Sequence, residues 1–203
     1  MKATDLLESQ HEEVADLFER IEKADDDDKS ELFEKLAARL VGHDAIEREI
    51  FYPAVERKLG MTEDLGEALV EHGVVEFSLY QADQALGEND FDHKLTVLKE
   101  MVEHHVEEEE REFFPKVEKA LGATRLEELG AQMQARFEAA LKSDFRVPLS
   151  ANLRQVLAGA LKTKPANGRT KAVSKTVLKK SVVRSSTPAR RAGKRRTLSR
   201  KSA

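Results

Sequence analysis

One motif of thirteen residues occurs twice in this chain and constrains the fold more than any other feature. Residues 43–55 read HDAIEREIFYPAV and residues 105–117 read HVEEEEREFFPKV, so both match H-x-x-x-E-x-x-x-F-x-P-x-V. His11 lies 32 residues before the first copy, and His72 lies 33 residues before the second. This repetition predicts two copies of one helical hairpin, each contributing a histidine and then a His-x-x-x-Glu pair.

The first 141 residues show helical periodicity, with no strand-like alternation and only two prolines, Pro53 and Pro115. Long helices joined by short loops must pack antiparallel, so we predict an all-α fold, an up-down-up-down four-helix bundle with a short fifth helix. Start and stop signals give these elements: a helix capped by Thr4, a loop at Asp25–Asp28, and helices from Ser30 to Leu59, from Thr62 to Leu86, from Asn89 or Asp90 to Leu121, and from Thr124 (a capping box with Glu127) to Leu141.

Charge divides the chain into two segments. Residues 1–144 hold all 38 acidic residues and 17 basic ones, a net charge of −21, whereas residues 145–203 hold 17 basic residues and no acid. We therefore predict a bundle domain over 1–142, a linker over 143–163 with a short helix at 150–162, and a disordered Lys/Arg-rich segment over 164–203, called the basic tail below.

The basic tail suggests two roles. Its cations favour non-specific binding to DNA or RNA phosphates, with an affinity that falls as salt rises. Alternatively, the basic tail is an electrostatic tether that folds back on the acidic bundle or keeps the protein soluble. The chain starts without a signal-peptide pattern and has no run of 18 apolar residues, so we expect no membrane partner and a cytoplasmic location, near the nucleoid if the basic tail holds DNA.

The spacing within the motif places its histidine and its glutamate one turn apart on the same helix face. In the first copy this pair is His43 and Glu47, and in the second copy it is His105 and Glu109. Both pairs are in register with the apolar positions of their helices, so we expect both to face the bundle core.

His11 and His72 also lie one turn from apolar residues, so four imidazoles and two carboxylates are expected to converge in the core. Carboxylates buried without partners cost several kcal/mol each, and two metal cations would remove that cost. The chain has no cysteine, and nitrogen and oxygen donors without sulfur suit iron, manganese or zinc.

These residues resemble the hemerythrin HHE cation-binding domain, over about residues 3–120. The resemblance implies a four-helix bundle with a non-haem di-iron centre, so iron is expected before manganese or zinc, with O₂, peroxide or NO as the small ligand. It also implies two bridging carboxylates, Glu47 and Glu109. The ligands carried across are His11, His43 and Glu47 from the first hairpin, and His72, His105 and Glu109 from the second.

One position departs from the pattern of the oxygen-carrying hemerythrins, which have His-x-x-x-His on the third helix. Here Glu76 follows His72. If Glu76 binds the metal, its charge favours the ferric state; if it does not, one iron keeps an open position. Both alternatives favour redox or sensing chemistry over oxygen transport. Catalase- or peroxidase-like turnover is one form of this function, and an iron sensor or store acting through stability is another.

Several neighbouring residues remain open. His104 is expected in solvent or beside a ligand, although an exchange of His104 for His105 is an alternative. Asp44 directly follows a ligand and is a candidate to touch the metal or to orient a ligand. Tyr52 and Tyr80 are candidate proton or electron donors. The two prolines are expected to end or bend their helices just past the site.

Overall fold

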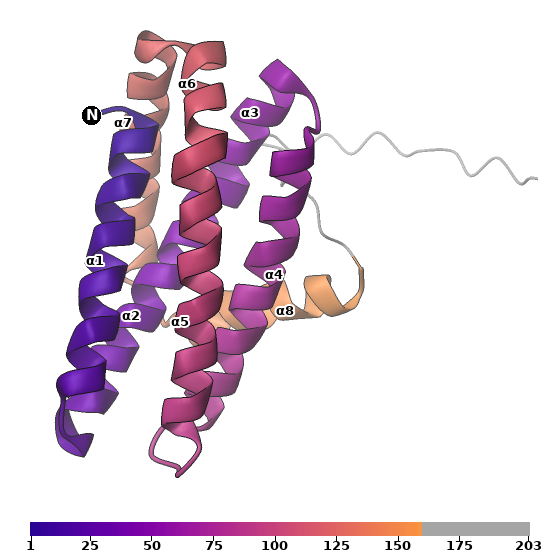
Figure 1. The fold of residues 1–203 in the computed structure, drawn as a ribbon. Coiled ribbons are helices and arrows are strands. Elements are labelled where there is room, and N and C mark those ends of the chain that lie inside the picture. Colours follow the sequence, from indigo (N-terminus) through magenta and orange to yellow (C-terminus); the bar gives the residue numbers. More distant parts are fainter. Residues whose placement is uncertain (160–203) are drawn as a thin grey trace, which may run out of the picture. The chain divides into compact units, whose positions relative to one another are not determined.

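The computed structural model describes residues 1–159, apart from the side chains of residues 26 and 27. Within this range the chain is helical and contains no strand, which confirms the predicted all-α fold (Figure 1). The elements are α1 (Ala3–Lys23), α2 (Asp26–Ile46), η1 (Glu47–Phe51), α3 (Tyr52–Leu59), α4 (Glu63–Gln84), α5 (Phe91–Glu108), η2 (Glu109–Phe113), α6 (Phe114–Leu121), α7 (Ala123–Ala140) and α8 (Arg146–Leu157).

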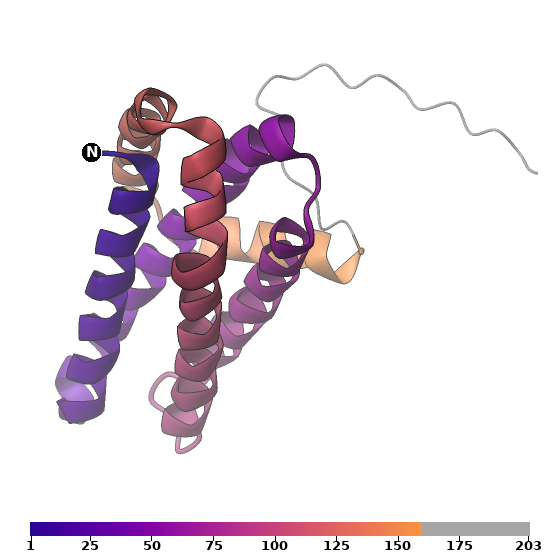
Figure 2. The ribbon, with the colours of Figure 1, turned by 45° about the horizontal axis from the view of Figure 1, so that its top comes forward.

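The helices form a bundle of two hairpins with two additional helices. Helix α1 packs against α2, and α4 packs against α5, which gives the predicted up-down-up-down arrangement. Helix α7 lies along α1 and α2, whereas α8 runs across the bundle and packs on α4 (Figures 1 and 2). Among the described helices, none combines the length and the apolar character that a membrane span requires.

A polar layer divides the core into two apolar clusters. Along α1, Leu7 belongs to one cluster and Val14 to the other, with the buried His11 between them. His72 repeats this order on α4, whereas the order is reversed on α2 and on α5 with η2, because these helices run in the opposite direction. We call the cluster that contains Val14 the first cluster, and its large members include Phe18, Phe33, Leu36, Leu79 and Leu98. The cluster that contains Leu7 is the second cluster, and its large members include Phe51, Tyr52, Val55, Leu65 and Phe114.

The start of two helices differs from the prediction. Helix α1 begins at Ala3 after an N-cap at Lys2, and Thr4 is buried with its hydroxyl donating to Glu118 Oε1 over 2.7 Å, so Thr4 is not a cap. The acidic run is not a loop but the start of α2. The Asp25 side chain accepts a hydrogen bond of 3.2 Å from the Asp28 backbone, and negative charge is favourable at a helix N-terminus.

The later helix starts give one confirmation and two corrections. Thr62 caps α4 by accepting from the Leu65 backbone over 3.2 Å, as predicted. The Thr124 capping box is wrong, because α7 begins at Ala123 directly after Gly122, whose φ is 75°. Helix α8 begins four residues earlier than expected, and Phe145, Leu149 and Leu153 anchor it in the first cluster. The basic tail lies outside the described residues.

Neither proline ends its helix. Instead, each follows a π-helical segment of five residues that begins at the motif glutamate, η1 before Pro53 and η2 before Pro115. A proline ring clashes with the carbonyl group four residues earlier in an α-helix, and the wider π turn relieves this clash. The Tyr52 backbone N–H accordingly donates to the Glu47 carbonyl oxygen, five residues back.

Close packing of α7 depends on two glycines. A Cβ atom on Gly130 would lie 2.5 Å from the Met1 carbonyl oxygen, and one on Gly42 would lie 2.9 Å from the Phe137 ring. Gly42 directly precedes His43, so α7 packs closely against the turn of α2 that carries the histidine.

Candidate metal centre

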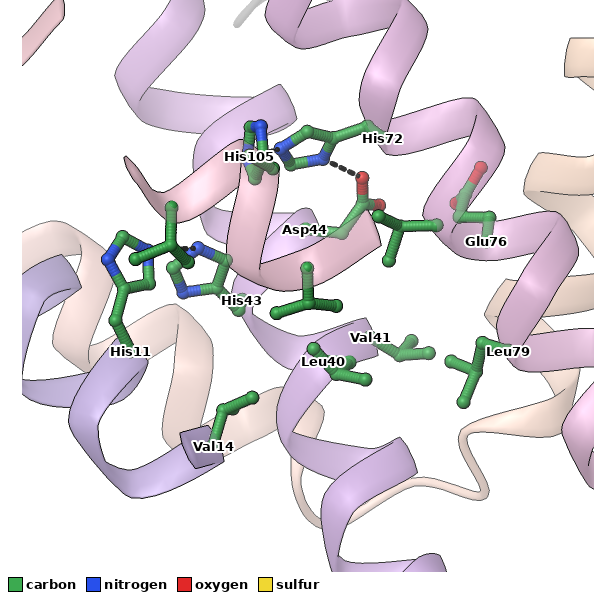
Figure 3. Close-up of a pocket in the computed structure, with 13 residues that line it drawn as sticks. His11, Val14, Leu40, Val41, His43, Asp44, His72, Glu76, Leu79 and His105 are labelled. Atoms are coloured by element: carbon green, nitrogen blue, oxygen red, sulfur yellow. Dashed lines mark hydrogen bonds and ion pairs between the residues drawn. The ribbon is translucent and has the colours of Figure 1, made fainter. Parts of the chain in front are cut away.

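Four buried histidines face one another across the bundle. His11 lies on α1, His43 on α2, His72 on α4 and His105 on α5, and each is at most 8% exposed. The Nε2 atoms of His11 and His43 are 3.3 Å apart, and those of His72 and His105 are 3.0 Å apart. Figure 3 shows His11 beside His43 and, above this pair, His72 beside His105. The structure therefore brings the four predicted imidazoles together.

The two motif glutamates lie between these histidine pairs. Glu47 Oε2 is 3.2 Å from His43 Nε2 and 3.0 Å from His72 Nε2. Glu109 Oε2 is 3.7 Å from His11 Nε2 and 3.5 Å from His105 Nε2. Each carboxylate thus reaches one histidine from each pair, which is the position that a bridging ligand needs.

The donor atoms form two groups that cross between the hairpins. One contains His11, His43 and Glu109, the other Glu47, His72 and His105, and the ligand atoms within each group lie within 4.8 Å of one another. Both oxygens of Glu47 and Oε2 of Glu109 lack a hydrogen-bond partner although both side chains are buried. Because a buried carboxylate without a partner is unfavourable, this donor set fits two cations.

Every imidazole in the centre is held through its Nδ1 atom, which leaves Nε2 facing inward. Such partners fix the ring orientation of a metal-binding histidine and increase its basicity. The four pairs are His11 with Glu110 Oε1 (2.8 Å), His43 with Gln10 Oε1 (2.9 Å), His72 with Asp44 Oδ1 (2.7 Å) and His105 with Glu71 Oε2 (2.8 Å).

Sequence reasoning identified only Asp44 among these anchors. The repeat contained a signal for two more, since Gln10 and Glu71 directly precede His11 and His72 at equivalent positions of the two hairpins. Each of these anchors holds the histidine of the neighbouring helix. Glu110 had no equivalent signal, because it lies in a run of four glutamates of which only Glu109 is fully buried.

Burial and the neighbouring charges shift the pKa values in the centre. Burial lowers the pKa of His11 to about 4, although its hydrogen bond to Glu110 opposes the shift. Burial and the charge of Glu47 raise the pKa of Glu109 to about 8. Burial also acts to raise the pKa of Glu47, but His43 and His72 outweigh it and hold that pKa well below its usual value. The surroundings therefore shift the pKa values of the two glutamates in opposite directions, down for Glu47 and up for Glu109.

Glu76 is not brought to the imidazoles. Its Oε2 accepts a hydrogen bond of 3.1 Å from the Arg48 guanidinium group, and burial and the nearby Asp44 raise its pKa to about 7. Arg48 also lies 3.5 Å from Asp44, and Asn152 of α8 donates to Asp44 over 3.1 Å. Sequence reasoning missed both Arg48 and Asn152, because the periodicity gives no signal for buried partners on other helices.

The two neighbouring histidines of α5 separate clearly. His105 is 5% exposed and belongs to the buried centre, whereas the His104 side chain is 59% exposed. His104 Nε2 lies 3.6 Å from Glu71 Oε1 and 3.5 Å from Glu108 Oε1, on the outer side of the helix. The structure thus places His105, and not His104, at the centre.

Tyr52 reaches the centre because of the π turn. It follows His43 by nine residues, which on an uninterrupted α-helix is a rotation of about 900°, or the opposite face. The wider turn of η1 instead brings its hydroxyl group 2.9 Å from Glu109 Oε1, to which it donates, and 2.8 Å from His72 Nε2. The equivalent residue of the second copy, Phe114, stacks on His11 with ring centroids 6.0 Å apart.

An apolar pocket lies beside the imidazoles. Figure 3 shows the histidines on one side and aliphatic side chains on the other. Asp44 and Glu76 are its remaining polar residues. Such a lining suits a small, weakly polar ligand and limits access of bulk water. The aliphatic side chains are Val14, Leu40, Val41, Val75, Leu79, Val102 and Val106.

Comparisons with known proteins agree with this geometry. The family model of the hemerythrin HHE cation binding domain matches residues 2–117. A crystal structure of a hemerythrin HHE cation binding domain-containing protein from Mycobacterium kansasii is 25% identical, with a TM-score of 0.62, over 79% of this chain and 94% of that chain. No curated protein matches the sequence. The chain belongs to the hemerythrin HHE cation-binding domain family.

Proposed function

We propose that this cation-binding domain holds two iron ions between its hairpins and uses them to react with or sense O₂, peroxide or NO. His11 and His43 bind one ion, His72 and His105 bind the other, and Glu47 and Glu109 bridge them. This assignment omits Glu76, which Arg48 holds.

The observation that carries the proposal is the set of carboxylate oxygens without hydrogen-bond partners among four inward-facing Nε2 atoms. Glu47 is 0% exposed and Glu109 is 2% exposed. Both side chains are thus removed from bulk solvent, and the nitrogen atoms nearest to them are the Nε2 atoms of the four histidines. Cations at this position neutralise both carboxylates, and nitrogen and oxygen donors of this kind suit iron.

Bound iron would give electrons to the small ligand, take electrons from it, or bind it reversibly. The protein residues provide the surroundings for this chemistry. The aliphatic side of the pocket excludes water, and the Tyr52 hydroxyl holds a proton beside Glu109. With Glu76 paired to Arg48, the second histidine pair lacks the extra side-chain ligand of the oxygen carriers, which supports redox or sensing chemistry.

Metal analysis with an optical spectrum tests this function. Purified full-length protein should contain close to two irons per chain, and its spectrum should change when the reduced protein meets air or peroxide. Glu47→Ala and His105→Ala should lose both properties, whereas His93→Ala, an exposed histidine of α5, should keep them. Iron content below one per chain after anaerobic reconstitution with Fe²⁺ contradicts the proposal.

A second candidate function, an iron sensor acting through stability, is favoured by the same unpartnered carboxylates. Without a metal they destabilise the fold, so ion binding and folding are coupled. A large difference in melting temperature between metal-free and loaded protein, without peroxide turnover, supports the sensor over the enzyme.

A further inference from the structure

A third group of metal-type donors lies outside the buried centre, on the surface between α4 and α5. It consists of Glu71, His104 and Glu108, whose ligand atoms lie within 4.8 Å of one another. His104 Nε2 is 3.6 Å from Glu71 Oε1 and 3.5 Å from Glu108 Oε1. Ligand atoms about 2.1 Å from one ion and at right angles to each other are about 3 Å apart, so small side-chain movements suffice for chelation. One imidazole and two carboxylates suit a divalent cation.

The surface group shares a residue with the buried centre. Glu71 uses Oε2 to hold His105 Nδ1 at 2.8 Å, while its Oε1 faces His104. The side chain of Glu71 is 22% exposed, that of Glu108 is 40% exposed and that of His104 is 59% exposed. The three donors therefore run from solvent inward and end beside a histidine of the centre.

An acidic pocket extends this surface group, and its lining includes a buried residue. Glu109 is only 2% exposed and its Oε2 atom lacks a hydrogen-bond partner, yet its side chain lines this pocket. Lys116 pairs with one of the outer carboxylates, Asp64. The pocket residues are Asp64, Glu67, Ala68, Glu71, Glu108, Glu109, Glu112 and Phe113.

We propose that Glu71, His104 and Glu108 form an entry site, which takes a divalent cation from solvent and delivers it along the acidic pocket to Glu109. This proposal deepens the proposed function and depends on it for the destination of the ion. The apolar pocket on the other side of the imidazoles is a poor route for a hydrated cation, since its lining offers few oxygen donors. A concentration of carboxylates at the entry raises the local cation concentration and the rate of association.

Loading of the metal-free, full-length protein with Mn²⁺ tests the entry site, because the free ion is counted by its paramagnetic resonance signal. The H104Q/E108Q variant should load the buried centre about tenfold more slowly than the wild type. Its final content should still be two ions per chain. H93Q/E100Q is the matched control, since it makes the same substitutions at exposed positions of α5, and it should load at the wild-type rate.

A second background separates the two proposals. In E47Q/E109Q, whose fold is checked by circular dichroism, one weak Mn²⁺ site should remain and should disappear when H104Q/E108Q is added. If this weak site is found but the wild type binds no further ions, the proposed buried centre fails while surface binding stands. If H104Q/E108Q matches the wild type in both rate and number of ions, the entry site is overturned.

Discussion

Tyr52 of the first hairpin donates a hydrogen bond of 2.9 Å to Glu109 Oε1 of the second, and both side chains are buried. The other oxygen of Glu109 lacks a hydrogen-bond partner, so the stabilisation of this buried carboxyl group by hydrogen bonding depends on Tyr52. It connects the aromatic residue of one motif copy to the metal-ligand candidate of the other.

Tyr52→Phe should therefore destabilise the metal-free protein by about 1–3 kcal/mol, because the substitution removes the donor and leaves Glu109 without it. Urea unfolding in a chelating buffer measures the change. Tyr80→Phe, on α4 and away from the centre, is the control and should change stability by less than about 0.5 kcal/mol. Equal effects of the two substitutions would show that the hydrogen bond to Glu109 contributes nothing specific.

Metal-free protein should lose stability as the pH rises from 6.5 to 8. Burial and the charge of Glu47 raise the pKa of Glu109 to about 8, and burial raises that of Glu76 to about 7. In this window the folded state binds more protons at these carboxyls than the unfolded state does, so raising the pH favours unfolding. His11, with its pKa lowered to about 4 by burial, acts in the opposite direction, mainly below about pH 7, where the unfolded histidine still binds a proton.

The pH dependence is measured by thermal unfolding in chelating buffers, and Glu109→Gln removes its main source. This variant should show a flatter profile between pH 6.5 and 8 than the wild type. Saturating metal should flatten the wild-type profile as well, because a bound cation stabilises the ionised carboxylates. A Glu109→Gln profile with the full wild-type slope would assign the titration to other groups.

Gln10→Ala should lower metal affinity by about 10- to 100-fold with little change in fold, because Gln10 orients the His43 ring through Nδ1. Competition with a chromophoric chelator measures the affinity. Gln84→Ala, an exposed position near the end of α4, should leave the affinity unchanged. An affinity of Gln10→Ala equal to that of the wild type would mean that the ring is held by its surroundings alone.

Substitution of two glycines by alanine should change stability in opposite directions. Gly42→Ala places a Cβ 2.9 Å from the Phe137 ring and should cost about 1–3 kcal/mol, whereas Gly66→Ala on α4 meets nothing within 4 Å. Gly66→Ala should gain up to about 1 kcal/mol from helix propensity. Thermal melting of both variants is a direct check, and a neutral Gly42→Ala would indicate that α7 can move away from α2.

Removal of the basic tail should abolish salt-sensitive retention on DNA, since residues 164–203 contain 14 basic residues and no acid. Retention of full-length and truncated protein on a DNA column, over a range of salt, measures this effect. The metal content of the truncated protein should match that of the full chain. If the truncated protein is still retained, the basic tail is not the segment that binds DNA, and the binding belongs to the rest of the chain.

The sequence predicts the fold and the inward histidines because these features repeat with the helix period. A candidate ligand at a regular position, such as His43 or His105, lies in register with apolar neighbours and can be identified from the helix period. The inward position of Tyr52 cannot be identified in this way, because the π turn before it changes the direction of its side chain from the one that an α-helix would give. Arg48 and Asn152 were missed for a different reason, because their contacts depend on which helices meet.

Helix ends show the same limit. Thr62 is a cap because Leu65 lies in the first turn of α4, where its backbone N–H group has no partner within the helix and donates to the Thr62 side chain instead. The local sequence predicts this cap. Thr4 is also a threonine but lies inside α1, where its hydroxyl group donates a hydrogen bond to Glu118 of α6, a helix far away in the sequence. Local sequence therefore identifies a residue that is able to cap, while tertiary contacts decide whether it does.

The crossed pattern of donors, with Glu109 beside His11 and His43 and with Glu47 beside His72 and His105, makes each donor group dependent on both hairpins. Neither hairpin alone supplies a complete group, so both groups are completed only when the two hairpins pack together. Mutual completion therefore couples assembly of the bundle to assembly of the centre.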